Sequence, residues 1–227
     1  MNIIVASHNE ETLKKYFDKS LLPDDSVLTV MRGYKNVSKA YNDALMITDP
    51  GLTMFVHHDV VLPKGWFDRL DEIIKKLPDD WGVIGVAGAS LEHSPIHSRL
   101  AYKGNIINDN VEWKHGAVGK GAEFETVQTL DEMLFIIKDI NMRFDENLGN
   151  HFYCADICMK ELSLGKRNYV INNCCFHSGG ENKVKDEKGE FIYSEDFYRS
   201  RDEIAKKYQV PFATTCTIIN YPYATNR

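Results

Sequence analysis

The chain has 227 residues, of which 43% are hydrophobic, and this length and composition fit one large α/β domain with a sizeable core. Its 27 basic and 33 acidic residues give a net charge of -6, which argues against nucleic acid or an anionic membrane surface as the main partner. No stretch approaches the roughly 20 apolar residues that span a bilayer, and residues 3–6 are too few for a signal peptide. We therefore expect a cytoplasmic protein without a transmembrane segment, acting on small or neutral partners.

The five cysteines are an odd number without the spacing of a disulfide framework, which indicates a reducing compartment. A zinc site built from Cys154, Cys158, Cys174 and Cys175 is one alternative. Because Cys174 and Cys175 are adjacent and lack the usual spacing of zinc ligands, we interpret these residues as buried thiols instead.

In the first 90 residues, short apolar runs alternate with amphipathic stretches. Ser7 and Glu10 have the spacing of a capping box that opens a helix. The apolar pattern predicts strands at residues 2–7, 26–31, 54–56 and 81–87. It predicts helices from the capping box at Ser7 to about residue 21, over 37–45, and from Pro63 to about 77. This alternation predicts parallel strands joined by right-handed crossovers.

The strand at residues 54–56 is too short for a helix and lies between two turns that contain proline and glycine, so we expect it to be buried on both faces. It ends in His57, His58 and Asp59. In an open α/β sheet, ligands bind outside the carboxyl ends of the strands. Asp59 is therefore well placed to hold a divalent cation against phosphate oxygens, the alternative being a strand that ends in solvated polar residues.

Residues 88–121 are rich in loop-forming residues, and we interpret them as a substrate-shaping insertion with one strand near 100–107. Further along, the pattern predicts a strand at 124–130, an apolar run at 133–137, a helix at 153–164, a strand at 168–172 and a final helix at about 194–208 before an irregular tail. The polar and charged residues 179–190 are expected to form a mobile loop.

Six segments, taken in order, share a pattern with one family of enzymes. They are Val-Ala-Ser-His-Asn-Glu at 5–10, Phe-Val-His-His-Asp-Val at 55–60 followed by Leu-Pro-Lys-Gly-Trp, Val-Ala-Gly-Ala at 86–89, Val-Gln-Thr-Leu-Asp-Glu at 127–132, Phe-Tyr-Cys-Ala-Asp-Ile-Cys at 152–158 and Phe-His at 176–177. By their order and spacing they resemble GT-A-fold glycosyltransferases, nearest to the family-2-like inverting enzymes and particularly their small "glycosyltransferase-like" branch. The resemblance covers residues 1 to about 180.

The resemblance implies a single GT-A domain over residues 1–227, an α/β fold with a mixed, mainly parallel central sheet flanked by helices. It implies a nucleotide-binding half at 1–90, an acceptor and metal half at 91–180, and a mobile loop, C-terminal helix and tail at 181–227. For the loop within 179–190, a lid that orders over the donor diphosphate and a disordered surface loop are the two alternatives.

The function implied by the resemblance is metal-dependent, inverting transfer of a sugar from a nucleotide-diphosphate donor to a hydroxyl of a glycan or other acceptor. Mn²⁺ or Mg²⁺ is the implied cofactor, and a UDP-sugar is favoured over GDP- and dTDP-sugars as the donor. The residue types fit, because a divalent ion neutralises the departing diphosphate and a base takes the proton of the acceptor hydroxyl.

By position, the resemblance assigns Asp59 and His177 to the metal and Asp156 to the general base. The same carry-over assigns Ser7, His8, Asn9, Arg32, Lys39 and His58 to the nucleotide, and Gly88, Trp113, Asp131 and Glu132 to the acceptor or donor sugar. His57 stands where the metal motif has its first acid, and the acidic segment usual after the second strand is missing.

These assignments have simpler alternatives. Asp156 can be a helix-capping carboxylate, His177 a core histidine and Trp113 a buried loop anchor. At the level of function, a metal-dependent nucleotidyltransferase or phosphohydrolase on a related sheet is one alternative. A non-catalytic sugar-nucleotide or glycan-binding module is the other, and the loss of the first motif acid favours it.

Overall fold

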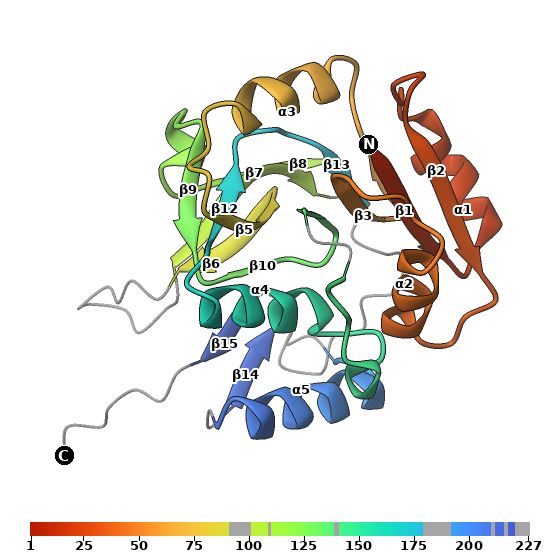
Figure 1. Ribbon diagram of the computed structural model, residues 1–227, viewed down its shortest axis with the longest axis vertical. Helices are drawn as coiled ribbons and strands as arrows, with labels where there is room; N and C mark the ends of the chain where they lie inside the picture. Colours follow the sequence, from red (N-terminus) through yellow and green to blue (C-terminus); the bar gives the residue numbers. More distant parts are fainter. Residues whose placement is uncertain are drawn as a thin grey trace.

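The computed structural model describes residues 1–90, 101–108, 110–138, 141–178 and 192–209, together with the backbone of two short strands at 212–215 and 218–220 (Figure 1). The loop predicted at residues 179–190, including the lid alternative, lies outside the described residues. The same holds for the last part of the predicted tail, residues 221–227.

A seven-stranded sheet forms the centre of the molecule, in the order β2-β1-β3-β11-β5-β12-β9 (Figure 1). Its strands are β1 at Asn2–Ser7, β2 at Val27–Arg32, β3 at Thr53–His57, β5 at Trp81–Gly85, β9 at Phe124–Val127, β11 at Leu134–Ile137 and β12 at Arg167–Ile171. Strands β2, β1, β3, β5 and β12 run in one direction, whereas β11 and β9 run against their neighbours. The prediction of a mixed, mainly parallel central sheet is confirmed.

Strand β11 lies between β3 and β5 and is antiparallel to both, an insertion that the strand–helix alternation did not predict. Phe135 pairs with Phe55 of β3 on one side and with Gly85 of β5 on the other. All of β11 is buried, because a strand with neighbours on both edges and apolar layers on both faces has no contact with solvent. Since β11 runs antiparallel, it begins at the sheet edge where β3 ends.

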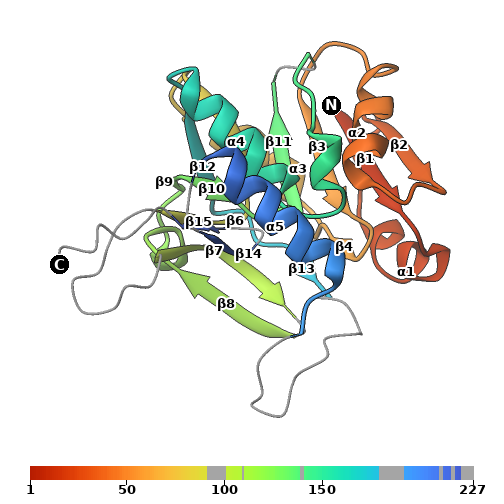
Figure 2. The same cartoon turned by 90° about the horizontal axis from the view of Figure 1, so that it is seen from below.

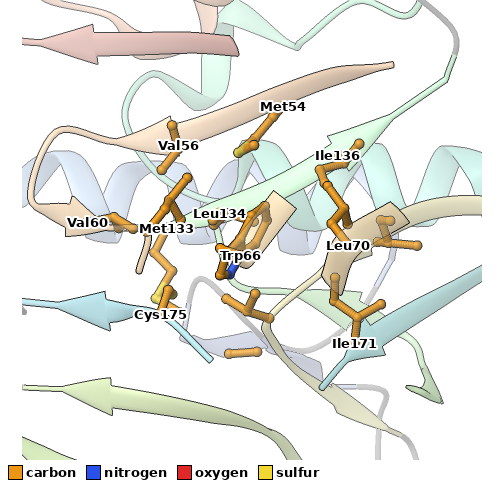
Figure 3. Close-up of a cluster of buried hydrophobic side chains, with 14 of the residues drawn as sticks. Met54, Val56, Val60, Trp66, Leu70, Met133, Leu134, Ile136, Ile171 and Cys175 are labelled. Carbon is orange, nitrogen blue, oxygen red and sulfur yellow. The ribbon is translucent and has the colours of Figure 1, made fainter. Parts of the chain in front are cut away.

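Helix α3 (Trp66–Ile74) covers one face of this sheet. Figure 3 shows Trp66 and Leu70 of α3 packed among Met54 and Val56 of β3 and Ile136 of β11. Each of these side chains is almost completely buried, and such burial stabilises a fold by roughly 1.5–3 kcal/mol per large apolar side chain.

Helices α2 (Val37–Leu45) and α4 (Tyr153–Ser163) cover the opposite face (Figure 1). There Tyr41 of α2 and Tyr153 of α4 pack with Phe55 of β3 and Phe135 of β11. Because successive strand residues point to opposite faces, Phe55 serves this layer while its neighbours Met54 and Val56 serve the α3 layer. The result is a helix–sheet–helix sandwich around one continuous sheet.

A second sheet has the order β10-β6-β7-β13-β4, with β8 paired to β7. Its strands are β4 at Val60–Val61, β6 at Ala87–Ser90, β7 at Ala101–Asn108, β8 at Val111–His115, β10 at Thr129–Leu130 and β13 at Phe176–His177. The prediction of one strand at 81–87 and one at 124–130 is wrong, because each segment forms two strands. The first segment continues from β5 in the large sheet into β6 in the second sheet, and the other continues from β9 into β10 in the same way.

The first helix begins later than the capping box predicted. Helix α1 spans Glu10–Lys15 and is followed by a 3-10 turn at Phe17–Lys19. Its N-cap is Asn9, whose side-chain oxygen accepts two backbone N–H groups of the first turn at 2.9 and 3.1 Å. Ser7 is instead the last residue of β1.

The start of α3 also differs from the prediction. The helix begins at Trp66 rather than at Pro63, and Gly65 occupies the N-cap position with φ of +81°. Glycine suits this place because it adopts positive φ without the steric penalty of a Cβ atom.

The predicted helices at 37–45 and 153–164 and the final helix are confirmed. The final helix, α5 (Glu195–Lys207), is capped by Ser194 and packs on α4 through Phe197 and Ile204 (Figure 2). Strands β14 (Phe212–Thr215) and β15 (Ile218–Asn220) form a separate antiparallel pair. In the described part of the chain, none of the helices combines the length and apolar surface that crossing a bilayer requires.

Candidate functional site

A cavity of about 970 Å³ opens at the carboxyl ends of β1 and β3. This is the edge at which open α/β sheets bind ligands. Eight of the residues predicted from the sequence line it: Ser7, His8, Asn9, His58, Asp59, Asp131, Glu132 and His177. His57 and His151 line it as well, so five of the eight histidines of the chain gather around one cavity.

His57, Asp59 and His177 form a cluster in this cavity. Oδ1 of Asp59 lies 3.4 Å from Nε2 of His177 and 3.9 Å from Nδ1 of His57. One ligand atom from each residue lies within 4.8 Å of the others, a spacing that fits coordination of one metal ion. The family resemblance predicts Asp59 and His177 as metal ligands. It does not predict His57, which stands where the family motif has an acidic residue.

The chain folds back on itself to assemble this cluster. Asp59 lies in the turn between β3 and β4, and β13 pairs antiparallel with β4, with His177 opposite Val60. This pairing places His177 beside Asp59 although 118 positions separate them in the chain. The hydroxyl of Ser178 donates to Oδ2 of Asp59 at 3.1 Å and orients the carboxylate.

The surroundings of Asp59 keep its carboxylate ionised, the form that binds a cation. Burial alone would raise its pKa, but the electrostatic influence of the nearby His177 and His57 rings and the hydroxyl of Ser178 hold the pKa of Asp59 below its ordinary value. Its Oδ1 is buried and accepts no hydrogen bond from any described residue. A buried charged oxygen without a donor is costly, and a metal ion at this place removes the cost. The residues present therefore fit a divalent metal.

A residue of α4 orients the ring of His57. Its Nε2 shares a 3.0 Å hydrogen bond with the hydroxyl of Tyr153, which leaves Nδ1 directed toward Asp59. Burial lowers the pKa of His57 to about 4, so the ring is neutral near pH 7 and its Nδ1 is available as a ligand. Phe152, just before Tyr153, has φ of +64°, a conformation that is costly for a residue other than glycine.

The residues predicted to hold the nucleotide form one wall of the cavity. The hydroxyl of Ser7 lies 3.0 Å from Nδ1 of His58, and the rings of His58 and His8 pack with their centres 4.5 Å apart. Burial and the charge of His8 lower the pKa of His58. Asn9 caps α1, so its backbone is fixed at the cavity rim.

Arg32 and Lys39 do not line the cavity. Arg32 is paired with Glu10, and Lys39 with Asp43 at 3.1 Å, both at exposed positions. These two nucleotide-binding predictions do not match the geometry. The loop after β2 contributes Tyr34 and Lys35 instead, and no motif in the sequence marks either residue as part of the site.

Asp156 is also placed away from the cavity. Its side chain is fully buried, and the hydroxyl of Tyr208 donates to its Oδ1 at 2.7 Å. Nζ of Lys207 and Nζ of Lys160 each lie 2.8 Å from its carboxylate. This side of α4 faces α5 rather than the cavity, so a substrate hydroxyl has no access to the carboxylate. The geometry does not support the general-base role expected for Asp156.

The four residues predicted to bind sugar divide between two cavities. Gly88 and Trp113 line a smaller cavity of about 200 Å³, Glu132 lines the larger one, and Asp131 lines both. A Cβ atom at Gly88 would lie 2.5 Å from the carbonyl oxygen of Thr129, so the strands can approach here only with glycine at this position. Tyr102 adds a second aromatic ring to the smaller cavity.

The fold is that of the GT-A class of glycosyltransferases, and a mannosyltransferase among the solved structures shares it. The mannosyltransferase PcManGT of Pyrobaculum calidifontis, in complex with GDP-Man and Mn²⁺, is 14% identical with a TM-score of 0.51, over 80% of this chain and 57% of that one. TarS of S. aureus, in complex with UDP-GlcNAc, is 16% identical with a TM-score of 0.47, over 91% of this chain and 65% of that one.

The sequence gives the family. The model of the glycosyltransferase-like family matches residues 2–194, and the chain belongs to this family. It is also 30% identical over 164 residues to "ATP synthase subunits region ORF 6" of Fuscovulum blasticum, over 69% of this chain and 59% of that protein. The chain thus spans about three fifths of the length of this curated relative.

Proposed function

We propose that this protein is a metal-dependent inverting glycosyltransferase that uses a nucleotide-diphosphate sugar as donor. Membership of the glycosyltransferase-like family supports sugar transfer. The observation that carries the metal-dependent part is the buried Oδ1 of Asp59, which faces two histidine nitrogens and receives no hydrogen bond from the described residues.

His57, Asp59 and His177 are the residues that would hold the ion. A bound divalent cation supplies neutralisation of the negative charge that develops on the leaving diphosphate. Two imidazoles with one carboxylate suit Mn²⁺ better than Mg²⁺, because Mg²⁺ favours a shell made entirely of oxygen atoms. The Mn²⁺ in the complex of the mannosyltransferase PcManGT is consistent with this preference.

The wall formed by Ser7, His8, Asn9 and His58 is the proposed nucleotide site. UDP-sugars are the first donors to test, and GDP- and dTDP-sugars are the alternatives, since PcManGT was solved with GDP-Man. The smaller cavity, with Trp113 and Gly88, is the proposed site for a ring of a glycan acceptor, because aromatic side chains present apolar faces for packing beside polar partners.

The test is binding of UDP with and without Mn²⁺ to the wild type and to Asp59→Ala. We expect Mn²⁺ to strengthen UDP binding in the wild type and to have no effect in the variant, because the central ligand is lost. A ligand at 100 times its Kd raises the free energy of unfolding by about 2.7 kcal/mol, so thermal shift detects the difference. The matched control is Asp80→Asn, a surface carboxylate paired with Arg167.

The reaction type is decided by the products formed from a panel of nucleotide sugars with a panel of glycans. Sugar transfer with release of UDP and inversion at the anomeric carbon supports the proposal. Release of UMP and sugar phosphate indicates a phosphohydrolase or nucleotidyltransferase instead. Tight Mn²⁺–UDP binding without turnover across the panel indicates a non-catalytic binding module.

A further inference from the structure

We propose that Asp131 is the general base of this transferase. Its carboxylate takes the proton of the acceptor hydroxyl as the hydroxyl oxygen attacks the donor sugar. This inference rests on the proposed function, and it names a residue other than Asp156, which is enclosed between α4 and α5.

The backbone holds Asp131 beside the metal-binding cluster. Its N–H donates to the carbonyl of Ala87 at 2.9 Å, and its Oδ1 accepts the N–H of Met133, also at 2.9 Å. The carbonyl of Met133 accepts the N–H of His57 at 2.8 Å. Asp131 is thus tied to β6 on one side and, through Met133, to β3 on the other. A base needs such a fixed position, because proton transfer depends on hydrogen-bond reach.

Asp131 also lies at the boundary between the two cavities. Of the acidic residues in the described part of the chain, it alone lines both of them. The larger cavity carries the metal-binding cluster, and the smaller cavity carries the rings of Tyr102 and Trp113. A base for glycosyl transfer must contact the acceptor hydroxyl while that hydroxyl faces the anomeric carbon of the donor. Asp131 meets this requirement if the donor occupies the larger cavity and the acceptor the smaller one, because it lines both.

The two other carboxylates of the larger cavity suit this role less well. Asp59 is committed to the metal-binding cluster. Glu132 is only 5% exposed, so a substrate hydroxyl has little access to its carboxylate, and its Oε1 lies 3.6 Å from Nδ1 of His151. Asp131 is half-buried, which combines access for a substrate with shielding from bulk water.

The chemical step is a single displacement. The acceptor O–H bond breaks and its proton goes to the carboxylate of Asp131, while the acceptor oxygen forms a bond to the anomeric carbon. The bond between that carbon and the diphosphate oxygen breaks, and the electron pair leaves with the nucleoside diphosphate. Solvent later takes the proton from Asp131, which restores the base, and the reacting carbon is inverted.

The experiment is Asp131→Asn, assayed as nucleoside diphosphate release from UDP-glucose, UDP-GlcNAc and GDP-mannose with Mn²⁺ and a glycan panel. We expect transfer to fall about 10²–10⁴-fold, the range for a lost general base. Mn²⁺–UDP affinity, measured by calorimetry, is expected to stay at the wild-type value, because the asparagine oxygen still accepts the N–H of Met133. The acidic limb of the pH–rate profile should disappear.

Two further variants make the result specific. Asp80→Asn, on the surface, controls for a general Asp-to-Asn effect. Glu132→Gln tests the neighbouring carboxylate, and we expect its residual activity to keep the acidic limb. If the wild type transfers sugar and Asp131→Asn transfers it equally well, the base assignment is wrong but the proposed function stands. Loss of the acidic limb in Glu132→Gln has the same meaning. A wild type that consumes none of the donors overturns the proposed function, and the base assignment with it.

Discussion

At the scale of single residues, the two ring nitrogens of His57 have different neighbours. Nδ1 faces Asp59, and Nε2 shares a hydrogen bond with the hydroxyl of Tyr153. When a histidine binds a metal through one nitrogen, a partner on the other nitrogen fixes its tautomer and orientation. Tyr153 is therefore a positioning residue for the proposed metal site, although it contacts no proposed ligand atom itself.

Tyr153→Phe removes this partner and leaves the aromatic packing in place. We expect Mn²⁺ affinity to fall about 10–100-fold, the usual effect of losing an outer-shell hydrogen bond, with little change in unfolding temperature without metal. Titration of Mn²⁺ followed by electron paramagnetic resonance measures this directly. Tyr169→Phe, which removes a buried hydroxyl from a different part of the core, is the matched control, and an equal loss there would contradict the prediction.

At the scale of elements, the residue expected to be catalytic instead joins two helices. Asp156 of α4 receives a hydrogen bond from Tyr208 and lies between Lys160 and Lys207, and Lys207 also pairs with Asp145 at 2.6 Å. The apolar contact between α4 and α5 is supplemented by this ionic group. The structure therefore gives Asp156 a role in holding α5 against the domain.

Asp156→Asn leaves the two lysines without a full negative charge between them. Removing one partner of a buried ion pair costs about 3–5 kcal/mol, and we expect the lower end because both lysines are partly exposed. Urea unfolding measures the loss. Asp202→Asn, at an exposed position of α5, should change stability by less than about 0.5 kcal/mol. Unchanged stability with lost sugar transfer in Asp156→Asn would restore the catalytic interpretation.

Sequence patterns predict where helices and strands lie better than they predict which other elements these pack against or pair with. The apolar spacing predicts the strand at 54–56 and the helix at 153–164, because burial imposes a local period on each. The same spacing does not show which side of α4 meets a helix that begins some 40 residues later, so Asp156 was misplaced. For the same reason the break between β9 and β10 was missed, since only the pairing in space assigns them to different sheets.

The candidate site was predicted in part for a related reason. Residues that follow the strands β1 and β3 reach the cavity because the carboxyl ends of parallel strands share one edge. Arg32 and Lys39 were placed by position in the family pattern, yet each has an acidic neighbour that holds it at the surface. The cytoplasmic location and the division into nucleotide and acceptor halves stay predictions.

At the scale of the whole molecule, stability should depend on pH through buried histidines. Burial lowers the pKa of His57 to about 4 and also lowers the pKa of His58, whereas histidine in an unfolded chain titrates near 6.5. Below that value the unfolded chain binds more protons than the folded protein, so protonation favours unfolding. The free energy of unfolding should therefore decrease as pH falls from about 6.5 toward 4. Above about pH 6.5 these two histidines should contribute no pH dependence.

Urea unfolding in EDTA at pH 7.5 and at pH 5.0 measures this dependence. The double variant His57→Asn with His58→Asn should show a smaller difference between the two pH values than the wild type. His115→Asn, on an exposed strand, should keep the wild-type difference. An equal pH dependence in the double variant and the wild type would show that other groups cause it.

The antiparallel strand β11 also has a consequence for the order in which the chain folds. Strands β3 and β5 are both present once residue 85 has been synthesised, yet they do not pair with each other and must wait for Leu134–Ile137 to enter between them. Until then each has an open edge of apolar strand, the kind of edge that promotes association between chains. During synthesis, the central sheet can therefore close only after the ribosome has passed Ile137.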